Sequence, residues 1–183
     1  MTRKMLLTVL CTVSFGIVQA QTVPAVILSQ SVSTDVPTVT KTESFYEHLP
    51  LVKEVISFAK AHLSIRYRSG GTTTRGFVCS GFTRFCYNKF GIHLPHSSAA
   101  QGNVGEAVDK GAALPGDLIL FKGHSAGGSR IGHVGMITEV IGDQIKFIHS
   151  AWNGGVRYDY LHVNYYQRRF MGIRRVTHLL AVK

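Results

Sequence analysis

RGFVCSGFTRFCYNKFGIHLP, residues 75–95, places Cys79 at the start of a predicted amphipathic helix. The N–H groups of a first helical turn have no partner within the helix and favour a thiolate, so cysteines in this position often have a lowered pKa. Cys79 is therefore a candidate nucleophile, and the alternative is a buried core thiol. Apolar side chains recur along one side of the predicted helix, at Phe82, Phe85, Cys86 and Phe90, and Gly91 supplies its C-terminal stop.

Two small residues, Ser80 and Gly81, follow the candidate nucleophile. Their size leaves room for a substrate carbonyl to approach the N–H groups of the first turn, which can act as an oxyanion hole. Cys86 has helical spacing from Phe82 and Phe90, and this spacing predicts a core residue.

Two histidines further along the chain supply a candidate base and a group to orient it. His133 enters a strand-like run directly after Gly132, and His149 closes the next such run. A turn at Gly142-Asp143 would join the runs as a hairpin and bring the two imidazoles towards each other. The register stays open, because a single bulge moves a side chain to the opposite face of its strand.

These residues predict a Cys/His arrangement of the triad type. Cys79 is the nucleophile, His133 the base and His149 the group that orients His133. Two alternatives stay open: each histidine taken singly can be structural, and the three side chains together can bind zinc. The position of Cys79 at a helix start argues against the zinc site.

Outside these motifs the periodicity of the chain changes from helical to strand-like. Residues 51–63, LVKEVISFAKAHL, follow Pro50 and present one broad apolar face, which predicts a helix. Helices followed by strands predict an α+β domain, with an antiparallel sheet packed against the helices. The predicted strands are short runs divided by turn signals, at 117–121, 133–140, 144–149, 156–160 and 168–176.

The N-terminal sequence indicates an export signal followed by a tether. Arg3 and Lys4 precede the apolar run MLLTVLCTVSFGIV, and VQA supplies a small-residue cleavage site, so residues 1–20 are predicted to be a signal peptide. Residues 21–42 show no helical period and are predicted to form an extended arm. Residues 43–183 form the remaining domain, exported to the periplasm or secreted, with no further apolar span for stable membrane insertion.

Cleavage would leave two cysteines, Cys79 and Cys86. Seven residues of helix separate their Cα atoms by about 10.5 Å, which exceeds the separation of about 7 Å that a disulfide tolerates. Two free thiols outside the cytoplasm favour a catalytic role for one of them.

The chain is basic, with a formal net charge of +10 that falls to +8 when the leader carries away its two cations. This charge suits an anionic partner such as a cell wall or a membrane surface, and export argues against nucleic acid. The alternatives are simple solubility and a solvated strand edge protected by charge. The residues that would form a basic face are Arg168, Arg169, Arg174 and Arg175.

Five segments, in this order, resemble the NlpC-type cell-wall cysteine peptidases of bacteria. They are YRSGGTTTRGFVCSGFTRFCYNKFGIHLPHSSAAQ, LPGDLILF, GHVGMI, FIHSAWNGGV and RRFMGIRRV, and the resemblance runs from about Leu51 to Val176. It implies a papain-like core and hydrolysis of the γ-D-glutamyl to diamino acid bond in peptidoglycan stem peptides, with no cofactor and no metal. Such an enzyme would have the stem peptides of the cell wall as its partners.

The resemblance also implies roles for individual residues. The nucleophile of the family matches Cys79, its base matches His133 and its third polar residue matches His149. A tyrosine that helps to line the substrate site matches Tyr67, and the serine after the nucleophile matches Ser80.

The chain departs from the family pattern at two positions. Val78 stands where an aspartate usually precedes the cysteine, and in some members that aspartate holds the free amino end of a stem peptide. His96 stands where an arginine usually follows Leu-Pro. Val78 is therefore predicted to face the substrate without binding its terminal amine.

Two other classes of function remain as alternatives. One is a non-catalytic wall-binding module with a vestigial triad, and the presence of Cys79, His133 and His149 counts against it. The other is an amidase or acyltransferase of the same superfamily. Permuted acyltransferases place histidine before cysteine, whereas Cys79 here precedes both histidines.

Overall fold

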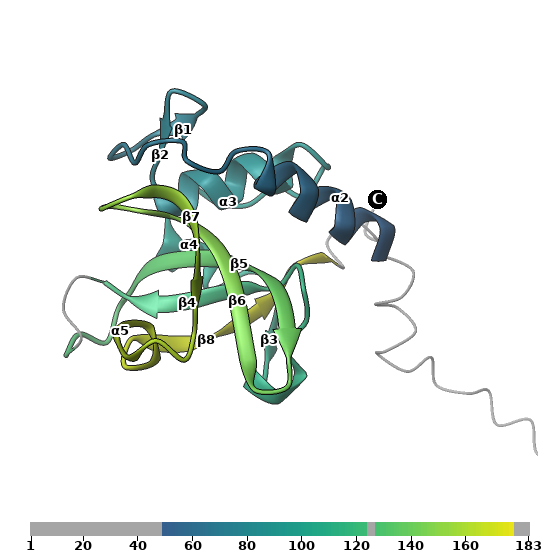
Figure 1. Ribbon diagram of the computed structural model, residues 1–183, viewed down its shortest axis with the longest axis vertical. Coiled ribbons are helices and arrows are strands. Elements are labelled where there is room, and N and C mark those ends of the chain that lie inside the picture. The colour runs from purple at the N-terminus through teal and green to yellow at the C-terminus, as the bar shows by residue number, and fades with distance from the viewer. Residues whose placement is uncertain (1–48, 124–126, 178–183) are drawn as a thin grey trace, which may run out of the picture. The chain divides into compact units, whose positions relative to one another are not determined.

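The computed structural model describes residues 49–123 and 127–177, and their fold is an antiparallel sheet packed against helices (Figure 1). The predicted signal peptide and arm lie outside these residues. In chain order the elements are α2 (Leu49–Lys60), β1 (Thr72–Thr73), β2 (Gly76–Phe77), α3 (Cys79–Asn88), α4 (Ser98–Gln101), β3 (Glu106–Val108), the 3-10 turn η1 (Lys110–Ala112), β4 (Leu118–Lys122), β5 (Ile131–Ile141), β6 (Gln144–Ala151), β7 (Gly155–Tyr160), α5 (Asn164–Gln167) and β8 (Phe170–Arg175).

The main sheet has six strands in the order β3-β8-β4-β5-β6-β7, and every neighbouring pair is antiparallel. Helices α2 and α3 lie together over one face of it (Figure 1). β1 and β2 form a separate hairpin directly before α3. This arrangement confirms the predicted α+β class and the predicted position of Cys79 at a helix start.

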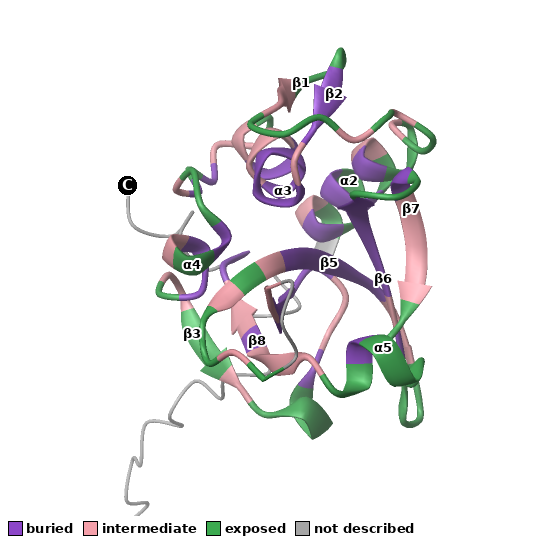
Figure 2. Cartoon of the chain, turned by 90° about the vertical axis from the view of Figure 1, so that its left-hand side faces the viewer, coloured by how far each residue is buried: buried purple, intermediate pink, exposed green. Residues whose placement is uncertain are grey.

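Two apolar clusters cover the two faces of the sheet, because side chains alternate along each strand. The first lies between the sheet and helices α2 and α3, whose inner surfaces are buried (Figure 2). The second, which we call the aromatic cluster, lies on the opposite face beneath α5. Its buried members are Ala113, Ile119, Phe121, Ile137, Ile145, Phe147, Leu161, Tyr166 and Ile173.

A bulge interrupts the pairing of β5 with β6. Ile137 pairs with Phe147, but the next pair is Glu139 with Lys146, so Thr138 is an extra residue in β5. A bulge of this kind reverses the faces to which the following side chains point. Ile137 and Val140 consequently both contact the aromatic cluster, although strict alternation would place them on opposite faces.

Six elements escaped the sequence-based prediction. They are β1, β2, α4, β3, η1 and α5, each two to four residues long. The edge strand β3 shows why, because its residues are exposed or half-buried and carry no alternation of polar and apolar side chains. In contrast, the five predicted strands correspond to β4, β5, β6, β7 and β8, and the first helix begins at Leu49 rather than after Pro50.

Within the described ranges, no helix has both the length and the apolar character that a membrane crossing requires.

Candidate active site

Cys79 is the first residue of α3, immediately after the hairpin formed by β1 and β2. Val78 is the N-cap, with extended backbone (φ −82°, ψ 161°) and no side-chain cap. The helix start packs against β5, so backbone N–H groups of Val134, Ser80 and Cys79 itself all approach the sulfur. Burial raises the pKa of the Cys79 thiol, and these N–H groups offset the effect only in part.

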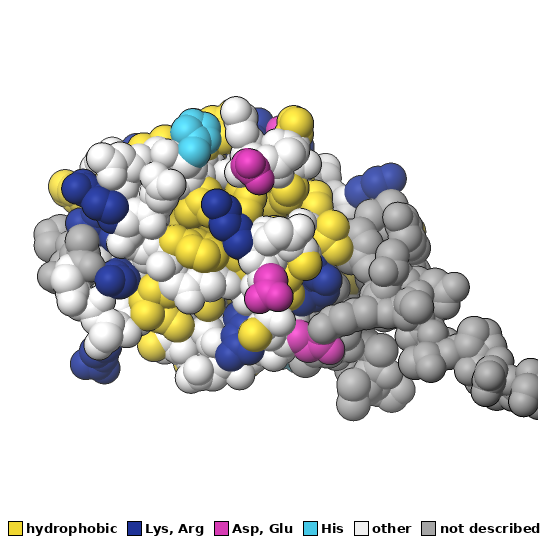
Figure 3. Space-filling view, turned by 90° about the horizontal axis from the view of Figure 1, so that it is seen from below, with side chains coloured by type: hydrophobic (Ala, Val, Ile, Leu, Met, Phe, Trp, Pro, Cys, Tyr) yellow, Lys and Arg dark blue, Asp and Glu magenta, His cyan; other side chains and the backbone are white. Residues whose placement is uncertain are grey.

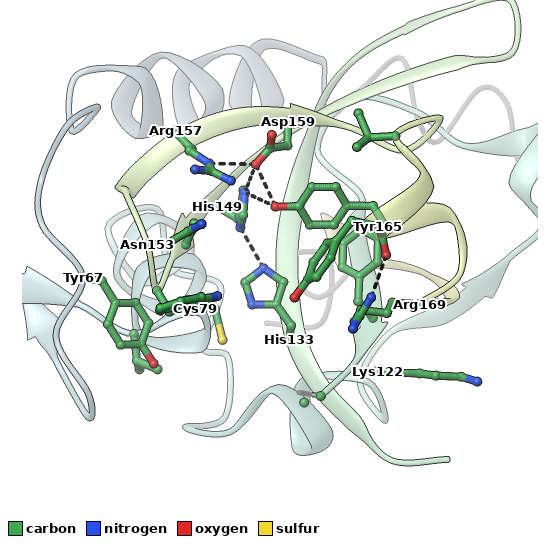
Figure 4. Close-up of a pocket in the computed structure, with 18 residues that line it drawn as sticks. Tyr67, Cys79, Lys122, His133, His149, Asn153, Arg157, Asp159, Tyr165 and Arg169 are labelled. Atoms are coloured by element: carbon green, nitrogen blue, oxygen red, sulfur yellow. Dashed lines mark hydrogen bonds and ion pairs between the residues drawn. The ribbon is translucent and has the colours of Figure 1, made fainter. Parts of the chain in front are cut away.

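The two histidines meet as the hairpin predicts. Nε2 of His133 in β5 lies 2.7 Å from Nδ1 of His149 in β6. The other nitrogen of the His133 ring lies on the side of the Cys79 sulfur (Figure 4). Burial lowers the pKa of His133 to about 3, with a further contribution from His149 beside it. Burial also lowers the pKa of His149, which is 1% exposed.

A carboxylate continues this line of contacts beyond His149. Oδ2 of Asp159 in β7 lies 2.8 Å from Nε2 of His149. It also accepts hydrogen bonds from Nε of Arg157 at 2.8 Å and from the hydroxyl of Tyr166 at 2.7 Å. Burial acts to raise the pKa of Asp159, but the bonds from His149, Tyr166 and Arg157 outweigh it and hold the pKa at about 2.

Asp159, Arg157 and Tyr166 were not predicted from the sequence. The run VRYDY does carry a usable signal for two of them, because Arg157 and Asp159 are two residues apart and so project from the same face of the strand. In the structure Arg157 pairs with His149 across the ladder, which places both side chains on the face of His149. Tyr166 carries no comparable signal, since it reaches the site from the short helix α5, which the sequence pattern does not reveal.

The aromatic cluster encloses the two imidazoles. The ring centroid of His133 lies 5.9 Å from that of Phe121, and the centroid of His149 lies 5.1 Å from Phe147 and 5.6 Å from Tyr166. Packing on this scale restricts the rotation of both imidazoles. His149 is buried, whereas His133 is half-buried and faces the pocket described below.

A pocket of about 460 Å³ opens over these residues and is lined by Cys79, His133, His149 and Asp159. Tyr67 lies on one side of the Cys79–His133 pair, whereas Lys122 and Arg169 lie on the other side (Figure 4). The remaining lining residues include Val78, Trp152, Asn153, Arg157, Tyr165 and Tyr166.

Both predicted substrate-facing residues Tyr67 and Val78 line the pocket, but Ser80 does not. Ser80 is 5% exposed, and its hydroxyl donates to the backbone carbonyl of His96 at 2.9 Å. The Ser80 side chain therefore fixes the loop at His96, and only its backbone N–H faces the thiol.

Gly81, which was predicted to leave room for a substrate carbonyl, has a different role in the structure. A Cβ at this position would overlap the carbonyl oxygen of Gly71. The missing side chain therefore admits the preceding loop against α3 and does not make room for a substrate.

The zinc alternative conflicts with the distance between the imidazoles. A zinc ion bound to two histidine nitrogens at its usual bond lengths would hold them about 3.3 Å apart, whereas the two nitrogens are 2.7 Å apart. In the described ranges no cluster of three or more His, Cys, Asp or Glu side chains has a metal-binding arrangement.

The remaining candidates have structural contacts. Cys86 is fully buried in the core, as predicted. Asp117 accepts a hydrogen bond from the backbone of Leu114 at 2.9 Å, and it binds Arg175, one of the four arginines predicted to form a basic face, at 2.8 Å. Arg174 donates to the carbonyl of Gly102 at 2.6 Å. On the face shown in Figure 3, Lys and Arg side chains stand singly among other residues and form no continuous patch.

Comparison with known proteins gives concordant matches. The model of the NlpC/P60 family matches residues 64–175. The chain is 35% identical over 113 residues to the murein DD-endopeptidase MepS/murein LD-carboxypeptidase of Escherichia coli K12, covering 61% of this chain and 56% of that protein. It is 34% identical over 125 residues to a probable endopeptidase NlpC homolog of Haemophilus influenzae, covering 68% of this chain and 62% of the relative.

Among solved structures, a crystal structure of an NlpC/P60 family protein from Bacillus cereus matches with a TM-score of 0.62 and 36% identity. The match covers 69% of this chain and 40% of that one. The chain therefore spans 56% and 62% of the length of these two curated relatives and less than half of this structure. The family model spans the helix that begins at Cys79 and all five strands from β4 to β8, and on this basis the chain belongs to the NlpC/P60 family.

Proposed function

We propose that the chain is an exported cysteine endopeptidase that hydrolyses the γ-D-glutamyl to diamino acid bond in peptidoglycan stem peptides. The observation that carries this proposal is the His133–His149 contact of 2.7 Å beside the helix-start thiol of Cys79. The names of the relatives, which are endopeptidases and murein peptidases, support the same class of reaction.

In the proposed reaction Cys79 is the nucleophile and His133 the general base. The sulfur attacks the amide carbon while its proton moves to Nδ1 of His133, the nitrogen that does not contact His149. The N–H groups of Cys79 and Ser80 stabilise the oxyanion. His133 then gives the proton to the leaving amine, and the C–N bond breaks to leave a thioester. Water attacks the thioester carbon while His133 accepts its proton. The C–S bond then breaks, His133 returns the proton to the sulfur, and the new carboxylic acid leaves.

The electrostatics favour a neutral resting pair. Burial raises the pKa of the Cys79 thiol and lowers the pKa of His133 to about 3, so both groups resist ionisation near neutral pH. Proton transfer therefore accompanies attack, and the imidazolium that forms gains stabilisation from the contact of its Nε2 with His149.

The charges of the pocket suit a substrate that is rich in carboxylates. Asp159 is the one carboxylate among its described lining residues, and it is engaged by Arg157, His149 and Tyr166. Lys122 and Arg169 add positive charge at the side away from Tyr67. The guanidinium of Arg169 lies 3.9 Å from the ring centroid of Tyr165, and its Nη1 donates to the backbone carbonyl of Tyr165 at 3.3 Å, so its charge is held at this side of the pocket. Stem peptides carry carboxylates at the D-glutamyl residue and in many cases at the diamino acid.

A second candidate is cleavage of a different bond in the same polymer. The Escherichia coli relative is named for DD-endopeptidase and LD-carboxypeptidase activities. The two candidates share Cys79, His133 and His149 and differ in the bond that the pocket presents to the thiol.

The test is mass spectrometry of defined muropeptides after incubation with the purified protein. We expect new products cut between D-glutamate and the diamino acid, absent when Cys79→Ala is used and present with Cys86→Ala as a matched cysteine control. Products cut at a D-alanyl bond would replace the first candidate with the second. Equal cleavage by Cys79→Ala would exclude a cysteine peptidase.

A further inference from the structure

We infer that Asp159 fixes the tautomers of both histidines in series, so that Nδ1 of His133 is left without a proton beside Cys79. Asp159 would thus be a positioning residue two contacts away from the reacting sulfur. The tautomeric arrangement follows from the contacts together with the charge states of the three side chains, and its catalytic consequence rests on the proposed function.

The first step concerns the carboxylate of Asp159. With its pKa held at about 2, Asp159 is ionised at neutral pH and can only accept hydrogen bonds. Nε of Arg157 can only donate, and the Tyr166 hydroxyl, whose pKa burial and Asp159 raise, keeps its proton and donates as well. All of these bonds converge on the same oxygen, Oδ2, which fixes the direction in which the carboxylate faces His149.

The second step concerns His149. Its Nε2, 2.8 Å from Oδ2 of Asp159, must carry a proton because the carboxylate can only accept. Burial keeps the imidazole neutral by lowering its pKa, so the ring holds a single N–H and its Nδ1 is an acceptor.

The third step transfers this constraint to His133. Nε2 of His133 lies 2.7 Å from the accepting Nδ1 of His149 and must therefore donate. His133 is neutral as well, so its Nδ1 has a lone pair and no proton. Figure 4 shows the ring of His133 between His149 and Cys79, with its second nitrogen on the side of the sulfur. A base that is to take the thiol proton requires this tautomer.

The hydroxyl of Tyr166 makes the role of Asp159 testable. It lies 3.3 Å from Nε2 of His149 in addition to its bond with Asp159. If the carboxylate is removed, this hydroxyl can donate to Nε2, which places the proton of His149 on Nδ1. His133 must then accept at Nε2 and carry its proton on Nδ1, where it cannot act as a base. Removal of the one carboxylate at position 159 would thus reverse the tautomers of both histidines.

Nitrogen-15 NMR of the histidine rings in the full chain reads the tautomers directly, because protonated and bare ring nitrogens have well-separated chemical shifts. In the native protein we expect Nε2–H on both His133 and His149. Asp159→Ala should move both protons to Nδ1, and Asp159→Ala combined with Tyr166→Phe should abolish the reversal. Asp159→Asn should keep the native tautomers, since Arg157 selects the amide oxygen as the acceptor.

The activity arm uses kcat/KM on the muropeptide substrate across pH. Loss of a general base costs about 10²–10⁴-fold in rate. The kcat/KM of Asp159→Ala should therefore be lower by this order near pH 7, and it should recover towards alkaline pH as the thiolate forms unaided. The kcat/KM of Asp159→Asn should lie between those of Asp159→Ala and the native protein. Glu139→Ala is the matched control, because it removes a carboxylate paired with Lys146 at 3.1 Å in the same sheet, and it should change neither readout.

The two arms separate this inference from the proposed function. Native tautomers other than Nε2–H, or tautomers that Asp159→Ala leaves in place, would overturn the inference whatever the activity. A native protein with the expected tautomers and no cleavage of any muropeptide would sustain the inference and overturn the proposed function. Equal loss of folded protein in Asp159→Ala and Asp159→Asn, seen as equal falls in Tm, would assign Asp159 a purely structural role.

Discussion

His133 and His149 lie on one face of the β5–β6 hairpin because Thr138 is an extra residue in β5. Their ring nitrogens are 2.7 Å apart. Without the bulge, the pairing of Val140 with Ile145 would continue unshifted along the strands, and His133 would project from the face opposite to His149. The contact between these residues therefore depends on a feature five residues away from His133.

The two histidines should differ in the cost of their removal. His133→Ala eliminates the group that accepts the thiol proton and should lower kcat/KM by about 10²–10⁴-fold. His149→Ala should leave more residual activity, since His149 orients the base and transfers no proton itself. Steady-state cleavage of a defined muropeptide measures both variants, and a larger loss for His149→Ala would reverse the two assigned roles.

The lowered pKa values of the two site histidines should make folding stability sensitive to acid. His133 has a pKa of about 3 when folded and about 6.5 when unfolded, so the unfolded state binds more protons between these values. The contribution of His133 to the free energy of unfolding is complete above about pH 6.5. It is lost as pH falls through this window, at up to about 1.4 kcal/mol per pH unit. The pKa of His149 is lowered in the same direction, and the lowered pKa of Asp159 causes a further loss of stability between about pH 4 and pH 2.

Urea unfolding at a series of pH values measures this dependence. His133→Gln should unfold more easily at pH 7 yet lose less free energy of unfolding between pH 6.5 and pH 4 than the native protein. Parallel curves for the two proteins would show that His133 does not titrate in this window.

Val78→Asp should shift the preference of the enzyme towards peptides with a free N-terminal amine. Val78 lines the pocket and caps α3 without a side-chain bond. A carboxylate at this position can pair with the ammonium group of the peptide, and a gain of about 1.4 kcal/mol corresponds to a tenfold change. The native protein, which lacks this charge, should be indifferent to the amine or favour stems linked to glycan.

The measurement is the ratio of kcat/KM for free and glycan-linked stem peptides. Val78→Asn is the matched control, because it can cap the helix as aspartate does but adds no charge. A strong preference of the native protein for free-amine peptides would contradict the prediction and require another acidic residue at the amine.

Arg169→Met should weaken cleavage of peptides that carry a carboxylate at the diamino acid. A charged hydrogen bond contributes about 1.5–3 kcal/mol, so we expect at least a tenfold rise in KM for a diaminopimelate peptide and a smaller one for its amide. Arg168→Met, a change to the exposed neighbour that does not line the pocket, is the control. Equal losses on both peptides would indicate that Arg169 supports the fold at Tyr165 and does not bind the substrate carboxylate.

Local sequence was sufficient to predict the two longer helices, the five strands β4 to β8 and three of the site residues. The apolar spacing after Cys79 identified α3, and short strand-like runs bounded by turn residues identified β4 to β8. His133 and His149 stood out as polar residues at the ends of apolar runs. Each of these signals depends on the few residues around it, because helical and strand periodicity are local properties.

Tertiary structure alone decided how these residues meet. The bulge at Thr138 shifts the register of β5 against β6, so that apolar side chains pack on both faces of the sheet. The packing on each face brings together residues that are far apart in the chain. Asp159 belongs to the site because β7 pairs with β6, and Tyr166 because α5 folds back over the aromatic cluster. Ser80, in contrast, is withdrawn from the site by a tertiary contact, since its hydroxyl donates to the carbonyl of His96, sixteen residues along the chain. Contacts of this kind depend on register and on packing across the sheet, and neither leaves a periodic pattern in the sequence.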